Sequence, residues 1–345
     1  MSGSAIQDSA AGDAGVLDAR ALLERLQQGP ASGDALAAAA GVTRAAVWKR
    51  IQALRAAGVE IRGRAGQGYA LAHPLVLLDA AAIAAALPAP ARAELADAHA
   101  LQVAWSVDST NTRLLRRPPP VRGCSVLLAE RQTAGRGRQG RRWASPLAAH
   151  LYLSVARRFG GGLARLGGLS LVAGVAAAEA LAALGAPVRL KWPNDLVVAD
   201  PGVGLRKLGG LLVEGGGEHA GPVRAVIGLG INLRMPAAAA AAIDQPWCDL
   251  AGLVEPLPDR NRLAAALLGQ LLPALRRFDA EGLAPFLPRH AAFDALAGRQ
   301  VVVEDGRDRL AGTALGLAAD GALRLRLETG GVRAFHAGEV RVRAR

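Results

Sequence analysis

A segment rich in arginine and glycine, residues 131–143, is the part of the sequence best suited to binding an anion. It reads RQTAGRGRQGRRW and contains five arginines and no acidic residue. Its glycines disfavour a regular helix or strand and let backbone amides approach a ligand, while arginine offers forked donors to a carboxylate or phosphate. The alternative is a disordered RNA-binding tract. The strand-like run Val126–Ala129 before the segment, and the sequence Trp-Ala-Ser-Pro that closes it, favour an ordered ligand-binding loop.

Lysine is rare in this chain, so each lysine is informative. Of the 41 basic residues only Lys49, Lys191 and Lys207 are lysines, and the others are arginines. A lysine therefore marks a position where the compact ammonium group is needed and the forked guanidinium of arginine cannot substitute for it. Lys191 opens the sequence Lys-Trp-Pro-Asn-Asp directly after a strand-like run, and we predict that it is a catalytic cation. Pro, Asn and Asp also form turns, so Asp195 is open to a structural role or a chemical one.

Three further segments place glycine or small polar residues at strand ends. The run Asp108-Ser109-Thr110-Asn111 follows a strand-like stretch, and residues 207–214 and 228–233 read KLGGLLVE and GLGINL. Glycine inside a strand indicates close approach of a ligand or of another backbone. These segments together predict a site for a small polar ligand with an anionic end. The only cysteines are Cys124 and Cys248, and without a Cys/His cluster we expect no metal site.

Strands and helices that alternate over residues 100–292 would position these groups, which predicts an α/β domain. The predicted elements are strands at Ser125–Ala129, Leu151–Val155 and Val188–Lys191 and helices at Leu169–Leu184 and Leu263–Phe278. An Ala- and Pro-rich stretch at 79–99 would bridge to the N-terminal section. The last section, 296–345, alternates short strands with turns and suits a small barrel. Its predicted strands are Val301–Val303, Leu323–Leu327, Val332–Phe335 and Glu339–Val342.

The first section, residues 16–78, has the pattern of a winged helix-turn-helix. Three short helices are predicted; Ser32 or Asp34 caps the second, Gly41 ends it, and Thr43 caps the third. The wing is predicted as strands at Val59–Arg62 and Gly68–Leu71. A local excess of basic residues favours DNA binding over a merely solvated basic face. The expected DNA contacts are Thr43, Arg44, Ala45, Lys49, Arg50, Arg62 and Arg64.

The bulk composition suits an intracellular protein with anionic partners. The formal net charge is +12, which favours nucleic acid, phosphate-bearing ligands or an acidic protein. The scarcity of cysteine fits a reducing compartment. Residues 1–15 lack the basic and apolar regions of a signal peptide and predict a disordered lead-in. We expect no apolar run of the roughly eighteen residues that a membrane span needs, and hence a cytoplasmic protein.

Taken in order, the segments DSTN, GRGRQGRRW, KWPND, KLGGLLVE and GLGIN resemble the motif set of biotin–protein ligases. The section before them resembles the winged helix-turn-helix of the bifunctional members, which also repress biotin-synthesis genes. Related lipoate ligases share the fold, but the GRGRxG loop is typical of the biotin ligases. The resemblance covers nearly the whole chain after residue 16. It implies an α+β protein with a winged helix-turn-helix, a central α/β domain of the biotin/lipoate ligase type and a C-terminal small SH3-like β-barrel.

The resemblance also implies roles for the matching residues. Lys191 and Arg138 would be catalytic, and Asn232 and Trp247 would contact the adenylate. Biotin or its adenylate would be bound by Ser109, Thr110, Asn111, Gln132, Arg136, Gly137, Arg138 and Lys191. After Asn232 the chain departs from the family, because Met235-Pro236 and the alanine run 237–242 replace a polar loop.

The implied reaction joins biotin to ATP, with Mg²⁺ on the phosphates, and releases pyrophosphate. The product, biotinyl-5′-AMP, passes its acyl group to a lysine of the biotin carboxyl carrier protein of acetyl-CoA carboxylase. The arginine-glycine loop would become ordered over the adenylate and promote a homodimer, which binds the operator DNA of biotin-synthesis genes. Two alternatives are a ligase with a vestigial DNA-binding module and a ligand-sensing transcription factor without ligase activity.

Overall fold

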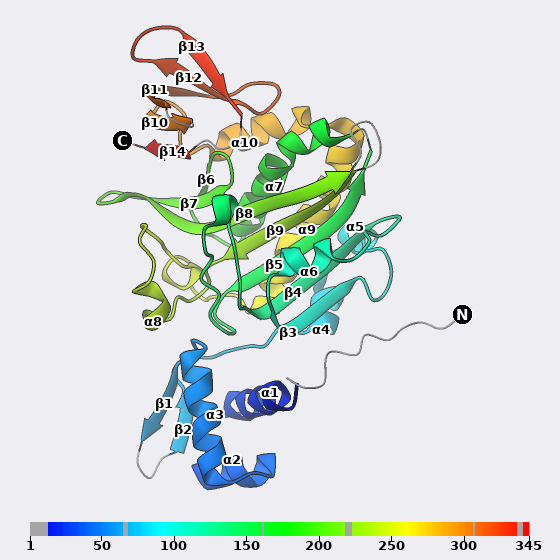
Figure 1. The fold of residues 1–345 in the computed structure, drawn as a ribbon, viewed down its shortest axis with the longest axis vertical. Helices are drawn as coiled ribbons and strands as arrows, with labels where there is room; N and C mark the ends of the chain where they lie inside the picture. Colours follow the sequence, from blue (N-terminus) through cyan, green and yellow to red (C-terminus); the bar gives the residue numbers. More distant parts are fainter. Residues whose placement is uncertain are drawn as a thin grey trace.

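The computed structural model describes residues 13–64, 68–160, 162–217, 223–305, 308–336 and 341–344, an α+β chain in three parts. A helical part with a two-stranded wing comes first, a seven-stranded sheet with helices on both faces follows, and a five-stranded antiparallel sheet comes last (Figure 1). Most of the predicted disordered lead-in, residues 1–12, lies outside the described residues.

The N-terminal part is a winged helix-turn-helix, as predicted. Its elements are α1 (Asp13–Gln27), α2 (Gly33–Ala40), α3 (Arg44–Ala56), β1 (Ile61–Arg64) and β2 (Gly68–Leu71). Ser32, and not Asp34, caps α2 by accepting from Ala35 N, and Thr43 Oγ1 accepts from Ala46 N at the start of α3. The wing begins two residues later than predicted. Val59 N donates to Leu54 O and so closes the end of α3 instead of starting a strand.

The central sheet has the strand order β3-β4-β5-β9-β8-β7-β6, and only the β3–β4 pair is parallel. Its strands are β3 (Leu101–Val107), β4 (Cys124–Gln132), β5 (Leu151–Phe159), β6 (Val188–Lys191), β7 (Asp195–Asp200), β8 (Gly204–Gly217) and β9 (Val223–Ile231). Helices α7 (Leu169–Ala183) and α9 (Arg260–Glu281) cover one face, and α6 (Thr110–Leu115) lies against the other (Figure 1). The smaller helices α8 (Ala237–Ala240) and α10 (Leu287–Phe293) complete this part.

Helix α7 is apolar around its whole circumference because it is buried between the sheet and α9. Residues Leu166–Ala183 form an apolar stretch of 18 residues, long enough by length and composition to cross a membrane, and 67% of the stretch is buried inside the protein. The expectation that no apolar run reaches this length is therefore wrong. The burial identifies the stretch as the central helix of the core.

The Ala- and Pro-rich stretch 79–99, expected to be a bridge, belongs to this core. It forms α4 (Ala80–Ala86) and α5 (Ala89–Arg92), which pack on α9 through the fully buried Ile83 and Ala91. Small apolar side chains allow these short helices to approach α9 closely. Composition alone therefore mistook a packed segment for a linker.

A buried polar cluster holds the chain between the N-terminal part and α4. Glu130 on β4 accepts a hydrogen bond from Leu78 N and forms a buried ion pair with Arg260. Asn261 accepts from Asp79 N at 2.8 Å and donates to Leu77 O at 3.1 Å. Because a buried charge is tolerated only when it is paired, this cluster fixes residues 77–79 to the core of the central part.

The C-terminal part is an antiparallel sheet of order β13-β12-β11-β10-β14. The strands are β10 (Gln300–Asp305), β11 (Asp308–Leu317), β12 (Leu323–Leu327), β13 (Val332–Phe335) and β14 (Arg341–Ala344). The predicted strand Glu339–Val342 falls partly on residues 337–340, which lie outside the description, and β14 begins at Arg341. The buried Trp192 of the central part shares this sheet's hydrophobic core with Val301 and Phe335.

Candidate active site

The face of the central sheet next to α6 is lined by small residues. Gly228 and Gly230 of β9 alternate with Ile227 and Leu229, which belong to the core on the opposite face. A Cβ on Gly228 would lie 2.4 Å from Asn111 Oδ1, and a Cβ on Gly230 would lie 2.7 Å from the indole ring of Trp143. Both glycines are therefore required by close approach of side chains, which agrees with the interpretation of this strand from sequence.

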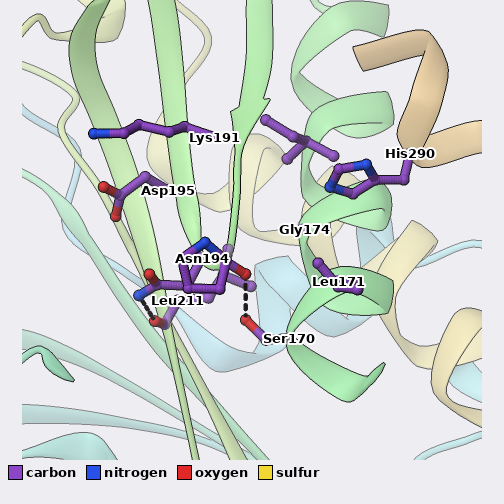
Figure 2. Close-up of a pocket in the computed structure, with 10 residues that line it drawn as sticks. Ser170, Leu171, Gly174, Lys191, Asn194, Asp195, Leu211 and His290 are labelled. Atoms are coloured by element: carbon purple, nitrogen blue, oxygen red, sulfur yellow. Dashed lines mark hydrogen bonds between the residues drawn. The ribbon is translucent and has the colours of Figure 1, made fainter. Parts of the chain in front are cut away.

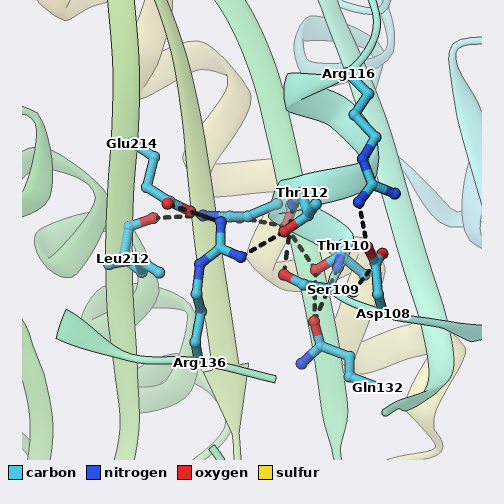
Figure 3. Close-up of polar contacts among 11 residues, drawn as sticks. Asp108, Ser109, Thr110, Thr112, Arg116, Gln132, Arg136, Leu212 and Glu214 are labelled. Carbon is cyan, nitrogen blue, oxygen red and sulfur yellow. Dashed lines mark hydrogen bonds and ion pairs between the residues drawn. The ribbon is translucent and has the colours of Figure 1, made fainter. Parts of the chain in front are cut away.

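Polar side chains at the start of α6 form a connected group with β4 and β5 (Figure 3). Ser109 caps α6, and Gln132 Oε1 accepts a hydrogen bond of 2.9 Å from Thr110 N. The fully buried Ser154 Oγ lies 2.7 Å from Thr110 Oγ1 and 2.6 Å from Asn111 Oδ1. The structure thus brings together Ser109, Thr110, Asn111 and Gln132, four of the residues to which the resemblance gave a role in binding biotin.

Glu214 of β8 ties Arg136 to the same group (Figure 3). Arg136 Nη2 donates to Glu214 Oε1 at 2.9 Å, and Arg136 Nη1 donates to Thr112 Oγ1 at 2.6 Å. Asn111 Nδ2 donates to Glu214 Oε2 at 2.8 Å. No role was predicted from sequence for Glu214, Thr112 or Ser154. Glu214 had a signal, as the one acid in a glycine-rich strand, whereas Ser154 is brought here only by strand pairing.

The arginine-glycine segment is an ordered turn. Gly137 N donates to Arg141 O at 2.7 Å, and Trp143 N donates to Gly135 O at 2.9 Å. Gln139 has a φ of 56°, a left-handed conformation that few non-glycine residues adopt. The ordered turn agrees with a ligand-binding loop and disfavours the alternative of a disordered tract.

A second group of charges lies around the turn between β6 and β7. Lys207 Nζ is 2.6 Å from Asp195 Oδ1 and 5.5 Å from the centre of the Trp143 ring. Arg138 Nη1 donates to Asn194 Oδ1 at 3.5 Å. Burial lowers the pKa of Arg138, and the nearby carboxylate of Asp195 opposes that shift. Lys207, which the sequence analysis left without a role, therefore stands inside the candidate site.

Lys191 lies opposite Asp195 in the β6–β7 pair, and Figure 2 shows their side chains extending in the same direction. The structure therefore places Lys191 and Lys207 on the two strands, β6 and β8, that flank the strand of Asp195. A cavity of about 10 Å³ beside them, lined in part by Ser170 and His290, holds no more than one water. The larger hollow on α9, near Arg277, lies away from every predicted site residue.

The turn that carries Asn194 and Asp195 is held from three sides. Trp192 Nε1 donates to Gly321 O of the C-terminal part at 3.1 Å. Ser170 Oγ of α7 donates to Pro193 O at 3.1 Å, and Asn194 Nδ2 donates to Leu211 O of β8 at 2.7 Å. These three hydrogen bonds tie the turn to the C-terminal part, to α7 and to β8, and so hold the side chain of Asp195 in place.

The two residues expected to contact adenine have different surroundings. The buried Asn232 donates to Cys248 O at 3.0 Å and to Lys207 O at 3.4 Å, so its amide hydrogens already bind the backbone. Trp247 is half-buried and forms a parallel bridge with Lys207. Both residues flank the Lys207 segment, while α8, formed by the alanine run, buries none of its residues.

Two features of this site suit an anionic ligand. The indole Nε1 of Trp143 is buried and has no hydrogen-bond partner among the described residues, which leaves a donor for a ligand. Cations from three segments, Arg138, Lys191 and Lys207, lie around the same turn. In the described ranges no group of three His, Cys, Asp or Glu residues could hold a metal ion.

The residues expected to bind DNA lie mostly on the surface. Thr43, Arg44, Ala45 and Lys49 of the α3 region and Arg62 of the wing are exposed, and Arg50 is half-buried. The side chain of Arg64 lies outside the description. Arg55, counted with the basic residues of this part, donates to Ile61 O at 2.9 Å and has a structural role.

Family models match all three parts of the chain. The model of the biotin/lipoate A/B protein ligase family matches residues 103–232, an HTH-domain model matches residues 19–70, and the biotin protein ligase C-terminal domain model matches residues 297–343. These matches fit the fold class predicted from sequence.

Relatives and solved structures extend this likeness to the whole chain. The bifunctional ligase/repressor BirA of Salmonella typhimurium is 41% identical over 316 residues, which span 91% of this chain and 93% of that protein. The biotin–[acetyl-CoA-carboxylase] ligase of Paracoccus denitrificans is 34% identical over 64% of this chain and 91% of its own length. The biotin protein ligase of Aquifex aeolicus, solved with biotin and ATP, has 26% identity and a TM-score of 0.59, covering 71% of this chain and 98% of that one. The chain belongs to the biotin protein ligase family, among the bifunctional ligase/repressors related to BirA.

Proposed function

We propose that this protein converts biotin and ATP to biotinyl-5′-AMP and then transfers biotin to a lysine of the biotin carboxyl carrier protein of acetyl-CoA carboxylase. One observation carries this proposal. The cations Arg138 and Lys207 lie next to a glycine-lined face of the sheet, beside the indole Nε1 of Trp143, which has no hydrogen-bond partner among the described residues. In this proposal biotin lies beside the Trp143 ring that covers Gly230, within reach of Ser109, Thr110 and Gln132.

The first step brings a carboxylate to the α-phosphate of ATP, and pyrophosphate leaves. Two anions must approach each other, so preorganised cations lower the barrier by positioning and charge neutralisation. Mg²⁺ would enter bound to ATP and neutralise its phosphates. We assign Arg136 and Arg138 to the closed loop over the adenylate, where they exclude water. Asn232 and Trp247 form the adenylate side of the site.

Two lysines compete for the role of the catalytic cation. The sequence pointed to Lys191, and the geometry adds Lys207, because its ammonium lies 2.6 Å from Asp195 and stands over the Trp143 ring. In this arrangement Asp195 positions Lys207. The acceptor lysine, with a reference pKa of about 10.4, must lose a proton before it attacks the acyl carbon and AMP leaves.

The N-terminal part supports the second half of the proposal, repression of biotin-synthesis genes. Biotinyl-5′-AMP would promote a homodimer through the ordered arginine-glycine loop, and the dimer would place two copies of α3 on operator DNA. The exposed cations Arg44, Lys49 and Arg62 support DNA contact. A cytoplasmic location is part of this proposal, since ATP, the carrier protein and DNA must all be accessible.

The test is incubation of the full chain with ATP, Mg²⁺, biotin and a biotin carboxyl carrier domain, followed by intact mass measurement. We expect one added biotin on the carrier and none when lipoate replaces biotin. Binding of the same protein to DNA upstream of biotin-synthesis genes, with biotin and ATP present, tests repression. Ligation without DNA binding would identify the DNA-binding module as vestigial, and DNA binding without ligation would identify a ligand-sensing transcription factor.

A further inference from the structure

Trp48 is the one exposed aromatic side chain among the large hydrophobic residues that the structure describes. Its exposed fraction is 55%, whereas Trp192 is buried and Trp105, Trp143 and Trp247 are half-buried. Tryptophan is enriched at interfaces because its ring is apolar and its N–H is polar, so an exposed indole on a helix bordered by basic residues offers a contact surface to a partner. Trp48 was not among the DNA-binding residues predicted from sequence.

The position of Trp48 on α3 places it on the face that the domain does not use for its own core. Val47, Ile51 and Leu54 are buried and hold α3 against the domain. Ala45 and Lys49, which are three residues before Trp48 and one after it, are exposed with it. Helical spacing puts these three side chains on one outward stripe.

Basic groups surround the indole. Arg44 precedes Trp48 by one helical turn, and its side chain is 77% exposed, with Asp34 as a distant partner at 3.8 Å. Lys49 is the next residue. The exposed stripe thus consists of the flat apolar ring of Trp48 bordered by the cations Arg44 and Lys49. Such a surface fits a partner that presents anionic groups and apolar groups side by side.

The major groove of DNA presents both kinds of group, phosphates at its rims and the C5-methyl of thymine on its floor. Lysine and arginine contact phosphates whatever the sequence, whereas an apolar contact with a thymine methyl carries sequence information. We propose that Trp48 contacts a thymine methyl in the major groove and makes this thymine a preferred base of the operator. The proposal rests on the operator binding proposed above.

The experiment selects duplexes from a random-sequence pool with the full chain, biotin, ATP and Mg²⁺, for the native protein and for Trp48→Ala. We expect the native protein to select a sequence with a conserved thymine in each half-site, and the variant to lose the preference at that position alone. Replacing this thymine by deoxyuridine, which removes only the methyl group, should weaken native binding about fourfold. It should leave binding by Trp48→Ala unchanged.

Lys49→Ala is the matched control, since it removes a neighbouring exposed cation and should keep the full response to deoxyuridine. Biotin transfer to the carrier domain should be equal in all three proteins, which shows that the variants fold. An equal response to deoxyuridine in the native protein and Trp48→Ala overturns the role of Trp48. If the native protein selects no sequence at all, operator binding itself fails, and the proposal fails with it.

Discussion

The candidate ligase site and the DNA-binding surface use similar residues in opposite ways. In the ligase site charged groups are held by partners of opposite charge, as in the contacts of Arg136 with Glu214 and of Lys207 with Asp195. On the DNA-binding surface, Arg44 and Lys49 extend into water. Acyl activation requires groups fixed to within a fraction of an ångström. Binding to a polyanion requires mainly that charges be available, because it is driven by release of counterions.

The largest expected effect tests the fixed cation of the ligase site. Lys207→Ala should lower the rate of biotinyl-5′-AMP formation by about 10²–10³-fold, the cost of losing one preorganised electrostatic contact in an active site. Pyrophosphate release measures this step. Lys191→Ala should have a smaller effect, and the reverse order would return the catalytic role to Lys191. DNA binding without biotin should be unchanged in both variants.

A pH experiment sharpens the contrast in burial between the two regions. His150 is fully buried in the ligase part, where it accepts a hydrogen bond from Leu233 N. Burial lowers its pKa to about 3, against about 6.5 in an unfolded chain. As the pH falls from 7, the unfolded chain binds a proton that the folded protein does not, so stability is lost between about pH 6.5 and 3. At pH 5 the loss should be about 2 kcal/mol.

Urea unfolding at pH 7 and pH 5 measures this loss, and His150→Asn should reduce it while keeping an acceptor for Leu233 N. The control is His73→Asn in the DNA-binding part, where the imidazole is exposed beside Glu60. This control removes an exposed imidazole and leaves the buried imidazole of His150 in place. His290, whose pKa burial also lowers, acts in the same direction and accounts for part of the remaining slope. Equal slopes for all three proteins would contradict the assignment to His150.

A glycine substitution tests the sheet face of the ligase site. Gly230→Ala places a methyl group 2.7 Å from the Trp143 ring, and overpacking of this kind costs about 1–3 kcal/mol. We expect the KM for biotin to rise about tenfold, with DNA binding in the absence of biotin unaffected. Gly216→Ala on β8 is the control, because its Cβ would meet nothing within 4 Å. A similar KM in both variants would show that Gly230 does not border the biotin site.

The smallest effect is expected on the DNA-binding surface. Lys49→Ala should weaken binding to every duplex by a few fold and lower the slope of log affinity against log salt by about one, the signature of one lost phosphate contact. Titration of fluorescent duplexes at several salt concentrations measures both quantities. A loss confined to one sequence would show that Lys49 binds a base, and that the DNA-binding surface is as specific as the ligase site.

Local signals in the sequence predicted much of the fold. The caps Ser32 and Thr43, the strands β12 and β13, and the buried helix α7 follow from short-range patterns, and they agree with the structure. Sequence patterns failed to predict segments whose structure depends on contacts with distant parts of the chain. Residues 79–99 resemble a linker until α9 covers them, and β11 has too weak an alternation to be recognised without its neighbours.

The candidate site shows the same division. Small polar residues at a strand end drew attention to Ser109, Thr110 and Asn111, and only the family resemblance added Gln132 to this group, which the structure places beside Thr110. The contributions of Ser154 and Glu214 depend on how β5, β8 and β9 align, which no local pattern records. The rarity of lysine identified Lys191 and Lys207 equally. The structure adds for Lys207 an ion pair with Asp195 and a contact with the Trp143 ring, and for Lys191 a position opposite the same Asp195 in the β6–β7 pair.

The indole of Trp192 has a consequence for how this protein can be divided. Along the sequence it belongs to the central part, yet in space it completes the core of the C-terminal sheet and donates to Gly321 O. A C-terminal fragment cut anywhere after residue 192 would carry a tryptophan-sized hole in its core. If the C-terminal part were exchanged for that of a relative, the new part would need a pocket that fits the Trp192 ring. The two parts are separate in sequence, yet they share one hydrophobic core.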